Sequence, residues 1–420
     1  MNKIQNSRIY PWLVVGLLWV VALLNYMDRQ MLSTMREAMQ LDIVELQQKE
    51  FFGKLMAVFL WIYAIFSPFA GSVADRVSRK WLIVVSLGVW SFVTLLMGYC
   101  TNYHQIYWLR AFMGVSEAIY IPAALSLIAD YFTGSTRSFA IGIHMTGLYM
   151  GQALGGFGAN VAHAFSWQTT FHWFGILGVG YAVVLMLLLH EKRNDKPMLQ
   201  STQTTATPSK LSIFKSLSLI FSNVAFWGIM FFFASSSLPG WATKNWLPEL
   251  FQKSLDLPME IVGPIATISI AISSFIGVMV GGPLSDKWVK KNVRGRIYTS
   301  SIGLALMIPS LVLMGLADVF NMSSLVVVIL SALCFGVGFG MFDANNMPIL
   351  CQFVPSSYRA TAYGLLNTVG VAAGAVVTMV LGKLADAGNL GVGFAVMSGM
   401  VVLALAVQLC VLNPKTDNME

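Results

Sequence analysis

Long apolar stretches separated by short polar segments run along the whole chain. Within each stretch the apolar residues are continuous rather than alternating, which is typical of membrane-spanning helices and not of β-barrel strands. A stretch of about 20 such residues is long enough to cross a hydrocarbon core of about 30 Å as a helix. The pattern predicts twelve spans, at 12–34, 54–74, 81–101, 106–130, 138–161, 167–189, 217–243, 259–283, 297–317, 324–349, 357–382 and 390–412.

The composition agrees with this pattern and excludes the main alternatives. Hydrophobic residues make up 56% of the 420-residue chain and charged residues only 11%. A soluble domain carries about 25% charged residues, so this chain cannot cover a water-exposed surface of its size. Four cysteines, without the spacing of a zinc site, also exclude a disulfide-built secreted protein. We therefore predict an all-α, polytopic membrane protein without a metal site.

The distribution of basic residues orients the predicted spans. Eighteen of the 26 Lys and Arg residues fall in the two termini and in the loops on their side of the membrane. The positive-inside rule then places both termini in the cytoplasm of a multi-pass protein of the cell (inner) membrane. The net charge of +7 follows mostly from this topology. We therefore expect the lipid bilayer as a partner, and no nucleic acid.

A polar segment divides the chain into two parts. It begins with a charged cluster at 191–196 and continues through a tract of Ser, Thr and Gln that has no apolar face to bury. The predicted organisation is an N-terminal six-helix bundle at 1–190, a cytoplasmic linker loop at 191–215 and a C-terminal six-helix bundle at 216–420.

Two short motifs recur in both parts. The pattern Gly-x-x-x-Asp followed by basic residues comes after the second and the eighth spans, and Arg-x-x-Ala-x-Gly comes after the fourth and the tenth. Repeated halves that flank a midplane site are the mark of alternating-access carriers. The charged motif residues are Asp75, Arg76, Arg79 and Arg137 in the first half and Asp286 and Arg359 in the second.

These loops resemble the signature of the major facilitator superfamily, although Val73 and Ser78 replace a Leu and a Gly of that signature. The resemblance implies a fold of 12 transmembrane helices in two pseudo-symmetric six-helix halves, and transport without an enzymatic activity. The motif charges are then gating residues whose ion pairs form in one state and break in the other. The simpler alternative is that they fix topology and hold the short loops.

Four ionisable residues are predicted to lie inside the membrane in the first half: Asp28, Arg29, Arg110 and Glu117. Such residues are costly in a bilayer and are functional candidates by default. Burial disfavours the charged form of a carboxyl and a nearby arginine favours it, so substrate binding at the arginine can control protonation. The alternative is a pair of structural salt bridges between helices.

The run Asn25-Tyr26-x-Asp28-Arg29, together with Arg110 and Glu117, resembles the anion:cation symporter branch of the superfamily. That branch includes bacterial sugar-acid carriers and the lysosomal sialic acid exporter. The resemblance implies that Asp28 and Glu117 are the proton-coupling carboxyls and that Arg29 meets the substrate carboxylate. Arg110 would belong to the same site and tune Glu117.

The same resemblance places Tyr63 and Gln152 near substrate-contacting positions. A second resemblance competes with it, because Gly114-Val-Ser-Glu117-Ala is also similar to a pattern in Spinster-like lipid carriers.

In the second half, polar residues gather on the tenth and eleventh spans. Asp343, Asn345 and Asn346 lie near the membrane midplane, where they either recognise substrate hydroxyl groups or bond neighbouring helices. Asn367 offers a weaker site of the same kind. Near the outer end of the seventh span, Trp241, Lys244 and Trp246 are either entrance residues or interfacial anchors.

The sequence therefore predicts a secondary active transporter that works by alternating access, and no enzyme. The leading interpretation is proton-coupled import of a carboxylated sugar or related organic anion of the sialic acid, hexuronate or aldonate class. The alternatives are a Spinster-like lipid or amphiphile exporter and a multidrug antiporter. The chain has no phosphate-binding loop of an ATP-driven pump, so the proton is the expected coupling ion, with no other cofactor. We expect the monomer to be functional.

Overall fold

The computed structural model describes residues 9–132, 135–191, 221–222, 224–317, 324–354 and 359–414. In these residues the chain forms thirteen α-helices and one short 3₁₀-helix. The first half contains α2 (Tyr10–Met39), η1 (Val44–Gln47), α3 (Lys49–Arg76), α4 (Arg79–Met97), α5 (Tyr103–Tyr131), α6 (Ser135–Gly155), α7 (Gly158–Ala164) and α8 (Trp167–Leu188). The second half contains α10 (Val224–Leu255), α11 (Met259–Val289), α12 (Gly295–Leu316), α13 (Leu325–Phe353), α14 (Arg359–Asp386) and α15 (Leu390–Cys410).

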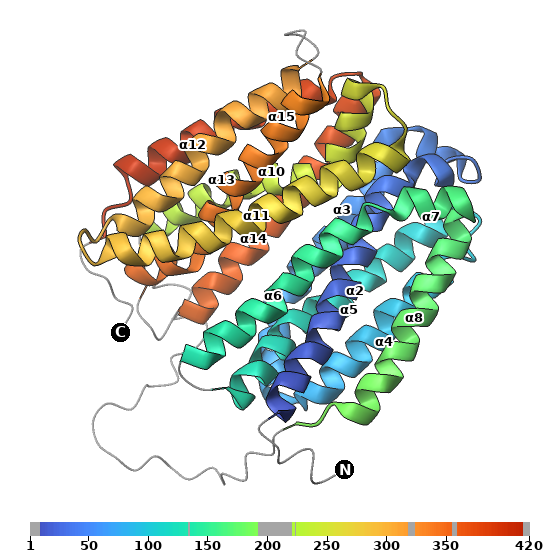
Figure 1. The fold of residues 1–420 in the computed structure, drawn as a ribbon, viewed down its shortest axis with the longest axis horizontal. Coiled ribbons are helices and arrows are strands. Elements are labelled where there is room, and N and C mark those ends of the chain that lie inside the picture. The colour runs from blue at the N-terminus through green and yellow to red at the C-terminus, as the bar shows by residue number, and fades with distance from the viewer. Residues whose placement is uncertain are drawn as a thin grey trace.

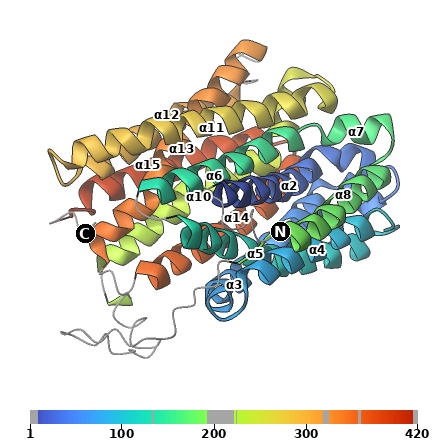
Figure 2. The ribbon, with the colours of Figure 1, turned by 60° about the horizontal axis from the view of Figure 1, so that its bottom comes forward.

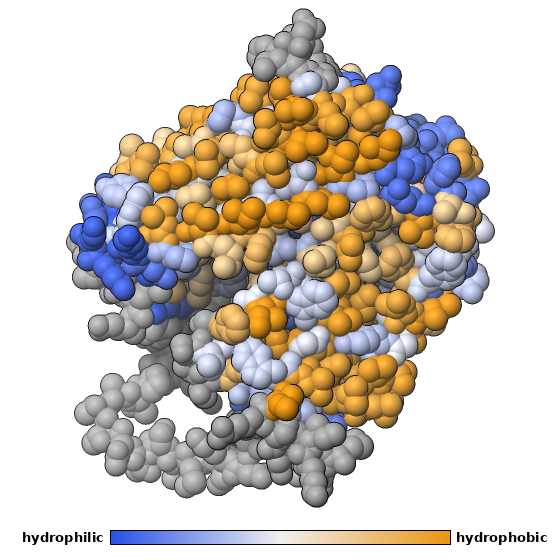
Figure 3. Space-filling view, in the orientation of Figure 1, coloured by the Kyte–Doolittle hydropathy of each residue, from blue (hydrophilic) through white to orange (hydrophobic). Residues whose placement is uncertain are grey.

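Ten of these helices are long and apolar enough to cross a membrane. The long helices α6 and α10 complete the set of twelve that the hydrophobic pattern predicts. Figure 3 shows apolar side chains over the flanks of the molecule and hydrophilic residues gathered towards two opposite ends. The prediction of an all-α polytopic membrane fold is therefore confirmed. The expected linker at 191–215 lies, apart from Glu191, outside the described residues.

The two halves repeat one packing arrangement. In the first half α2 packs on α6, α3 on α5, and α4 on both α5 and α8. In the second half α10 packs on α14, α11 on α13, and α12 on both α13 and α15. Across the middle, α3 meets α14 and α6 meets α11, so the halves lie side by side (Figures 1 and 2).

Two ends of this bundle have to be distinguished. We call the end at which α2 begins and α15 ends the terminal end, and the opposite end the distal end (Figure 1). The loops after α3, α5 and α11 lie at the terminal end. The loops after α2, α4 and α10 lie at the distal end.

The structure changes the ends predicted for the fifth and the seventh spans. The fifth span was predicted at 138–161, but α6 ends at Gly155 and the short helix α7 follows. The break comes where Gly156 meets α11 so closely that a side chain there would collide with Thr267 and Gly263. The seventh span was predicted to end at 243, but α10 continues to Leu255. It can continue because its distal turns are packed inside the protein, where Trp246, Leu247, Leu250 and Phe251 are buried.

Glycines let α6 approach α2 closely, as the glycine-rich pattern of α6 predicts. A Cβ atom at Gly147 would lie 2.6 Å from the backbone oxygen of Trp19. A Cβ atom at Gly151 would collide with the backbone oxygen of Leu23. The two backbones therefore touch near the middle of the first half, which fixes the position of the charged residues on α2.

Candidate functional site

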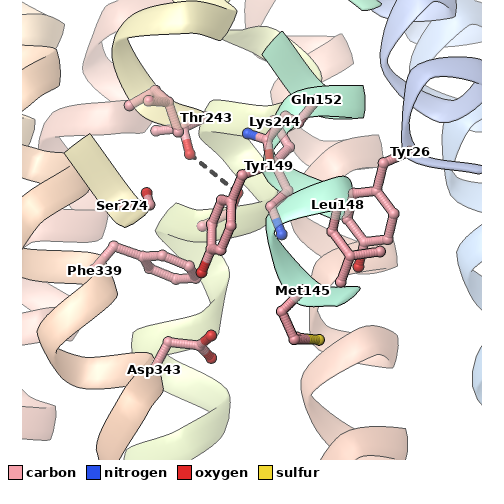
Figure 4. Close-up of a pocket in the computed structure, with 12 residues that line it drawn as sticks. Tyr26, Met145, Leu148, Tyr149, Gln152, Thr243, Lys244, Ser274, Phe339 and Asp343 are labelled. Carbon is pink, nitrogen blue, oxygen red and sulfur yellow. Dashed lines mark hydrogen bonds between the residues drawn. The ribbon is translucent and has the colours of Figure 1, made fainter. Parts of the chain in front are cut away.

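A cavity lies between the two halves, near the middle of the long helices (Figure 4). It encloses about 500 Å³ of empty space, part of it open to solvent. Helices from both halves form its wall. The lining residues are Tyr26 from α2, Met145, Leu148, Tyr149 and Gln152 from α6, Gly240, Thr243 and Lys244 from α10, Ile270 and Ser274 from α11, and Phe339 and Asp343 from α13.

A buried ion pair stands behind the Tyr26 wall of this cavity. The Nε of Arg29 donates to Oε2 of Glu117 at 2.5 Å, and Nδ2 of Asn25 donates to the same oxygen at 2.7 Å. The Glu117 side chain is fully buried and that of Arg29 is 13% exposed. One carboxylate oxygen thus holds two donors from α2, 88 or more positions away in the sequence.

Aromatic rings surround the guanidinium of Arg29. Its Cζ lies 5.1 Å from the ring centre of Tyr26, 4.8 Å from that of Phe59 and 5.0 Å from that of Tyr63. Rings at such distances attract a cation. The predicted substrate residue Tyr63 is therefore a neighbour of Arg29. Because Tyr26 also lines the cavity, one ring separates this ion pair from the space that a substrate would enter.

Asp28 and Arg110 lie in the same buried region. Oδ2 of Asp28 accepts a hydrogen bond from Oγ1 of Thr94 at 3.1 Å. The Arg110 guanidinium lies 4.8 Å from the ring centre of Phe59 and donates to Sδ of Met113 at 3.2 Å. The carboxylate of Glu117 thus bonds Arg29 rather than Arg110, the partner on its own helix that the sequence favours.

The second half places two charges in the cavity wall. Asp343 on α13 lines the cavity, and its Oδ1 accepts from Nδ2 of Asn346 at 3.2 Å. Asn345 is buried and donates to the backbone oxygen of Met341 on its own helix at 2.8 Å. Lys244 on α10 also lines the cavity. The polar residues of α13 therefore have different roles: Asp343 faces the cavity, whereas Asn345 bonds the backbone of its own helix.

Other predicted residues have separate positions. Gln152 lines the cavity, as the sequence resemblance suggested. Asn367 on α14 donates to Oγ of Ser67 on α3 at 3.1 Å, which joins the halves on the terminal side. Trp246 is fully buried and donates to the backbone oxygen of Thr378, so it is no interfacial anchor.

A cluster of charges joins the halves at the distal end. Oε1 of Glu249 on α10 lies 2.6 Å from Nζ of Lys49 and 3.2 Å from Nη2 of Arg36. The carboxylate of Asp386, at the end of α14, accepts from the first two backbone N–H groups of α3, at 2.7 and 2.8 Å. A carboxylate at a helix N-terminus is favourable because it satisfies free donors and complements the helix dipole. Both interactions tie the two halves together.

The sequence did not point to this distal cluster. Glu249 lies beyond the predicted end of its span, and Lys49 and Arg36 are predicted in an outer loop. The signal that could have shown it is the apolar periodicity that continues from 243 through Trp246, Leu250 and Phe251.

At the terminal end the two repeated motifs build matching helix ends. Arg137 donates from Nε to the backbone oxygen of Phe132 at 3.1 Å and from Nη2 to that of Ala129 at 3.0 Å. Arg359 makes the same pair of bonds at the end of α13, to Val354 and Cys351, both at 3.2 Å. The sequence repeat therefore extends to individual hydrogen bonds.

The acidic partners in these motifs differ between the halves. Asp286 pairs with Nη1 of Arg296 at 3.1 Å. Arg79 pairs with Asp130 at the end of α5, and its backbone N–H donates to Glu191. The side chains of Asp75 and Arg76 lie outside the described part of the structure. The gating role expected of Asp75 and Arg76 stays a prediction.

In the part of the chain that the structure describes, twelve long helices form two matching halves with a charged cavity between them, which is the architecture of a membrane transport protein. The family model described as Major Facilitator Superfamily matches residues 18–378. The chain belongs to this superfamily, which confirms the resemblance seen in its loop motifs.

Two relatives and one solved structure illustrate the similarity. The probable galactarate/D-glucarate transporter GarP of Escherichia coli (strain K12) is 24% identical over 405 residues, which cover 89% of this chain and 88% of that protein. The hexuronate transporter of Bacillus subtilis (strain 168) is 24% identical over 406 residues, covering 93% of each chain. The crystal structure of a bacterial homologue of the human lysosomal transporter Spinster, inward-facing and unoccupied, has a TM-score of 0.78 at 18% identity. It covers 96% of this chain and 97% of that chain, and it shows the fold alone.

Proposed function

We propose that this protein is a secondary carrier that imports a carboxylated sugar or related organic anion together with protons. The proton is its coupling ion, and no other cofactor takes part. Both termini lie in the cytoplasm, where the excess of basic residues places them. One chain contains both halves of the cavity, so a monomer is the transport unit.

The bond between Arg29 and Glu117 carries this proposal. While Glu117 is charged, it holds the guanidinium that would otherwise bind a substrate carboxylate. A proton on Glu117 weakens this ion pair and frees Arg29, whereas a substrate carboxylate at Arg29 removes the positive partner that keeps Glu117 charged. Substrate and proton therefore bind together more favourably than either binds alone. Asp28, one residue before Arg29, is the second carboxyl that can take up a proton.

The cavity wall suits a hydroxylated anion. It combines one ammonium, one carboxylate, one amide and the hydroxyl groups of Tyr26, Tyr149, Thr243 and Ser274. Such groups exchange hydrogen bonds with sugar hydroxyls. The two relatives named above, for galactarate or glucarate and for hexuronate, support the sugar-acid class.

Alternating access follows from the position of the contacts between the halves. The ion pairs at the distal end hold that side closed, and with cytoplasmic termini the structure faces inward. Import requires this cluster to open while the terminal side closes, and the motif residues Arg79, Arg137, Asp286 and Arg359 lie where that closure takes place.

Uptake into proteoliposomes tests the proposal. Wild-type protein should accumulate a radiolabelled sugar acid when the outside is made acidic, and an uncoupler should abolish this accumulation. Glu117→Gln resembles the protonated carboxyl, so it should keep substrate exchange between the two sides but lose accumulation driven by the pH gradient. Glu260→Gln, at the distal start of α11, is the matched control and should behave as wild type. Wild-type uptake that is indifferent to the gradient and the uncoupler would refute proton coupling.

A second candidate function is the transport of an amphiphile. An apolar groove of about 760 Å³ lies between α6 and α11, and Tyr149 borders both this groove and the polar cavity. A lipid chain in the groove could accompany a headgroup in the cavity. Uptake or binding of a lysolipid in preference to any sugar acid would favour this alternative.

A further inference from the structure

Lys244 is the cation that lines the cavity itself, whereas Arg29 and Arg110 are not among the lining residues. Arg29 is paired with Glu117, but no carboxylate of the described residues lies within 4.0 Å of the Lys244 ammonium. Instead, Nζ lies 5.0 Å from the ring centre of Trp241 and 5.8 Å from that of Phe339. Figure 4 shows the side chain reaching into the cavity between Tyr149 and Tyr26. An ammonium that lines the cavity without an ion-pair partner among the described residues can form a charge-assisted contact with a ligand anion, so a ligand that supplies a negative charge there gains affinity.

The backbone fixes Lys244 opposite the Arg29 site. Nε2 of Gln30, the residue after Arg29, donates to the backbone oxygen of Lys244 at 2.8 Å. This bond joins α2 of the first half to α10 of the second at the height of the cavity. Lys244 of the second half therefore lines the cavity, and Arg29 of the first half lies directly behind its Tyr26 wall.

Asp343 explains how the cavity tolerates the ammonium. Its carboxylate faces the same cavity from α13 and is held by Asn346. It offsets the charge of Lys244 through the cavity without forming an ion pair. An ammonium without a direct partner remains available for a ligand anion, and the carboxylate with its neighbouring amide remains available for ligand hydroxyl groups.

We propose that Lys244 is a second anion-binding residue, which makes the carrier prefer sugar diacids, with a carboxylate at each end, over the corresponding monoacids. This inference rests on the proposed sugar-acid transport. One carboxylate would bind Arg29 in the first half and the other Lys244 in the second, so a diacid would connect the two halves that move relative to each other.

The expected effect follows from the energy of a charge-assisted hydrogen bond. Such a contact changes affinity by about 10- to 150-fold. Lys244→Gln should therefore weaken diacid binding by at least about 10-fold. The monoacid does not use this contact, so its affinity should change by less than about 3-fold. Lys244→Arg keeps the charge and should retain most of the preference.

The experiment compares D-glucarate with D-gluconate, which has the same carbon chain but carries a primary alcohol in place of one carboxylate. Dissociation constants are measured by calorimetry on monodisperse purified protein at one fixed pH, for wild type, Lys244→Gln and Lys244→Arg. Lys290→Gln, at the terminal end of α11 and outside the cavity, is the control for loss of a positive charge. We expect a selective loss of glucarate affinity in Lys244→Gln alone.

A second variant tests the same inference in the opposite direction. Asp343→Asn removes the carboxylate that offsets Lys244, so the ratio of glucarate to gluconate affinity should rise by about 3-fold or more. This variant also covers the case in which Lys244→Gln does not fold. Equal losses for both acids in Lys244→Gln, or an unchanged ratio in Asp343→Asn, would overturn the assignment while leaving sugar-acid transport intact. Wild-type protein that binds neither acid would refute the proposed function itself, and this inference with it.

Discussion

Replacement of Glu249 by Gln tests what holds the distal end closed. The Glu249 carboxylate is 8% exposed and contacts both Lys49 at 2.6 Å and Arg36 at 3.2 Å, across the boundary between the halves. Gln keeps the shape and one acceptor oxygen but loses the charge. Because the contacts join opposite halves, they exist only while the distal side is closed. Their loss therefore destabilises the distal-closed state and leaves the distal-open state unchanged.

The magnitude follows from the number and burial of these contacts. A hydrogen bond to a charged group contributes about 1.5–3 kcal/mol, which is roughly a 10- to 150-fold change in an equilibrium constant. If the distal-open state makes up about 1% of the wild-type protein, Glu249→Gln should raise it to roughly 10–60%. The change should be visible without any substrate.

Distances between spin labels measure this shift. Labels at Leu41→Cys and Ile261→Cys lie at the distal end of opposite halves, at positions that are 81% and 48% exposed. They would be placed in a background that lacks the four native cysteines. Double electron–electron resonance should show, in Glu249→Gln, an additional population with a longer distance between the two labels than in the wild-type protein. Glu50→Gln is the control, because its pairs with Lys54 and Lys383 lie on the exposed rim, and it should shift the distances much less. Superimposable distributions for wild type and Glu249→Gln would show that this cluster does not hold the distal side.

Three further predictions concern packing and reactivity. Gly151→Ala should lower the melting temperature, because its new methyl group collides with the α2 backbone. Gly142→Ala is the control: it has open space around it and should be neutral or slightly stabilising. Equal melting curves for the two variants would contradict the close packing of α6 on α2. Burial raises the pKa of the Cys100 thiol to about 11. Maleimide at pH 7.5 should therefore label this thiol at least about 100-fold more slowly in the native protein than after denaturation. Similar labelling rates would show that the thiol is not buried. Arg137→Ala and Arg359→Ala each remove two hydrogen bonds to carbonyl groups at a helix end, so each should reduce transport and thermal stability by a similar amount. A loss confined to one variant would argue against equivalent roles of these arginines in the two halves.

The loop motifs show which structural features local sequence alone predicts. The recurrence of Arg137 and Arg359 in matching loops predicted two related halves, and the structure gives both arginines the same bonds to the preceding helix end. This prediction succeeded because each bond joins residues only five to eight positions apart in the sequence. The gating role of Asp75 stays a prediction, because its side chain lies outside the described part of the structure.

Local sequence did not predict the ion pairs inside the membrane. Periodicity placed Arg110 and Glu117 on one face of a helix, yet the structure pairs Glu117 with Arg29 on another helix. In a soluble protein the polar face of a helix identifies its solvent side. Here the lipid-facing and protein-facing sides are both apolar, so the pattern does not show how each helix is rotated.

The sequence by itself determined the membrane environment, the twelve spans, their order and the two-fold repeat. These properties depend on the length of apolar runs and on local motifs, which any single stretch of chain displays. The tertiary structure alone decided that Lys244 faces the cavity, that Glu249 joins the halves and that Asn345 does not line the site. Each of these depends on the rotation and tilt of helices that are far apart in the sequence, and close packing at glycines such as Gly151 and Gly156 sets both.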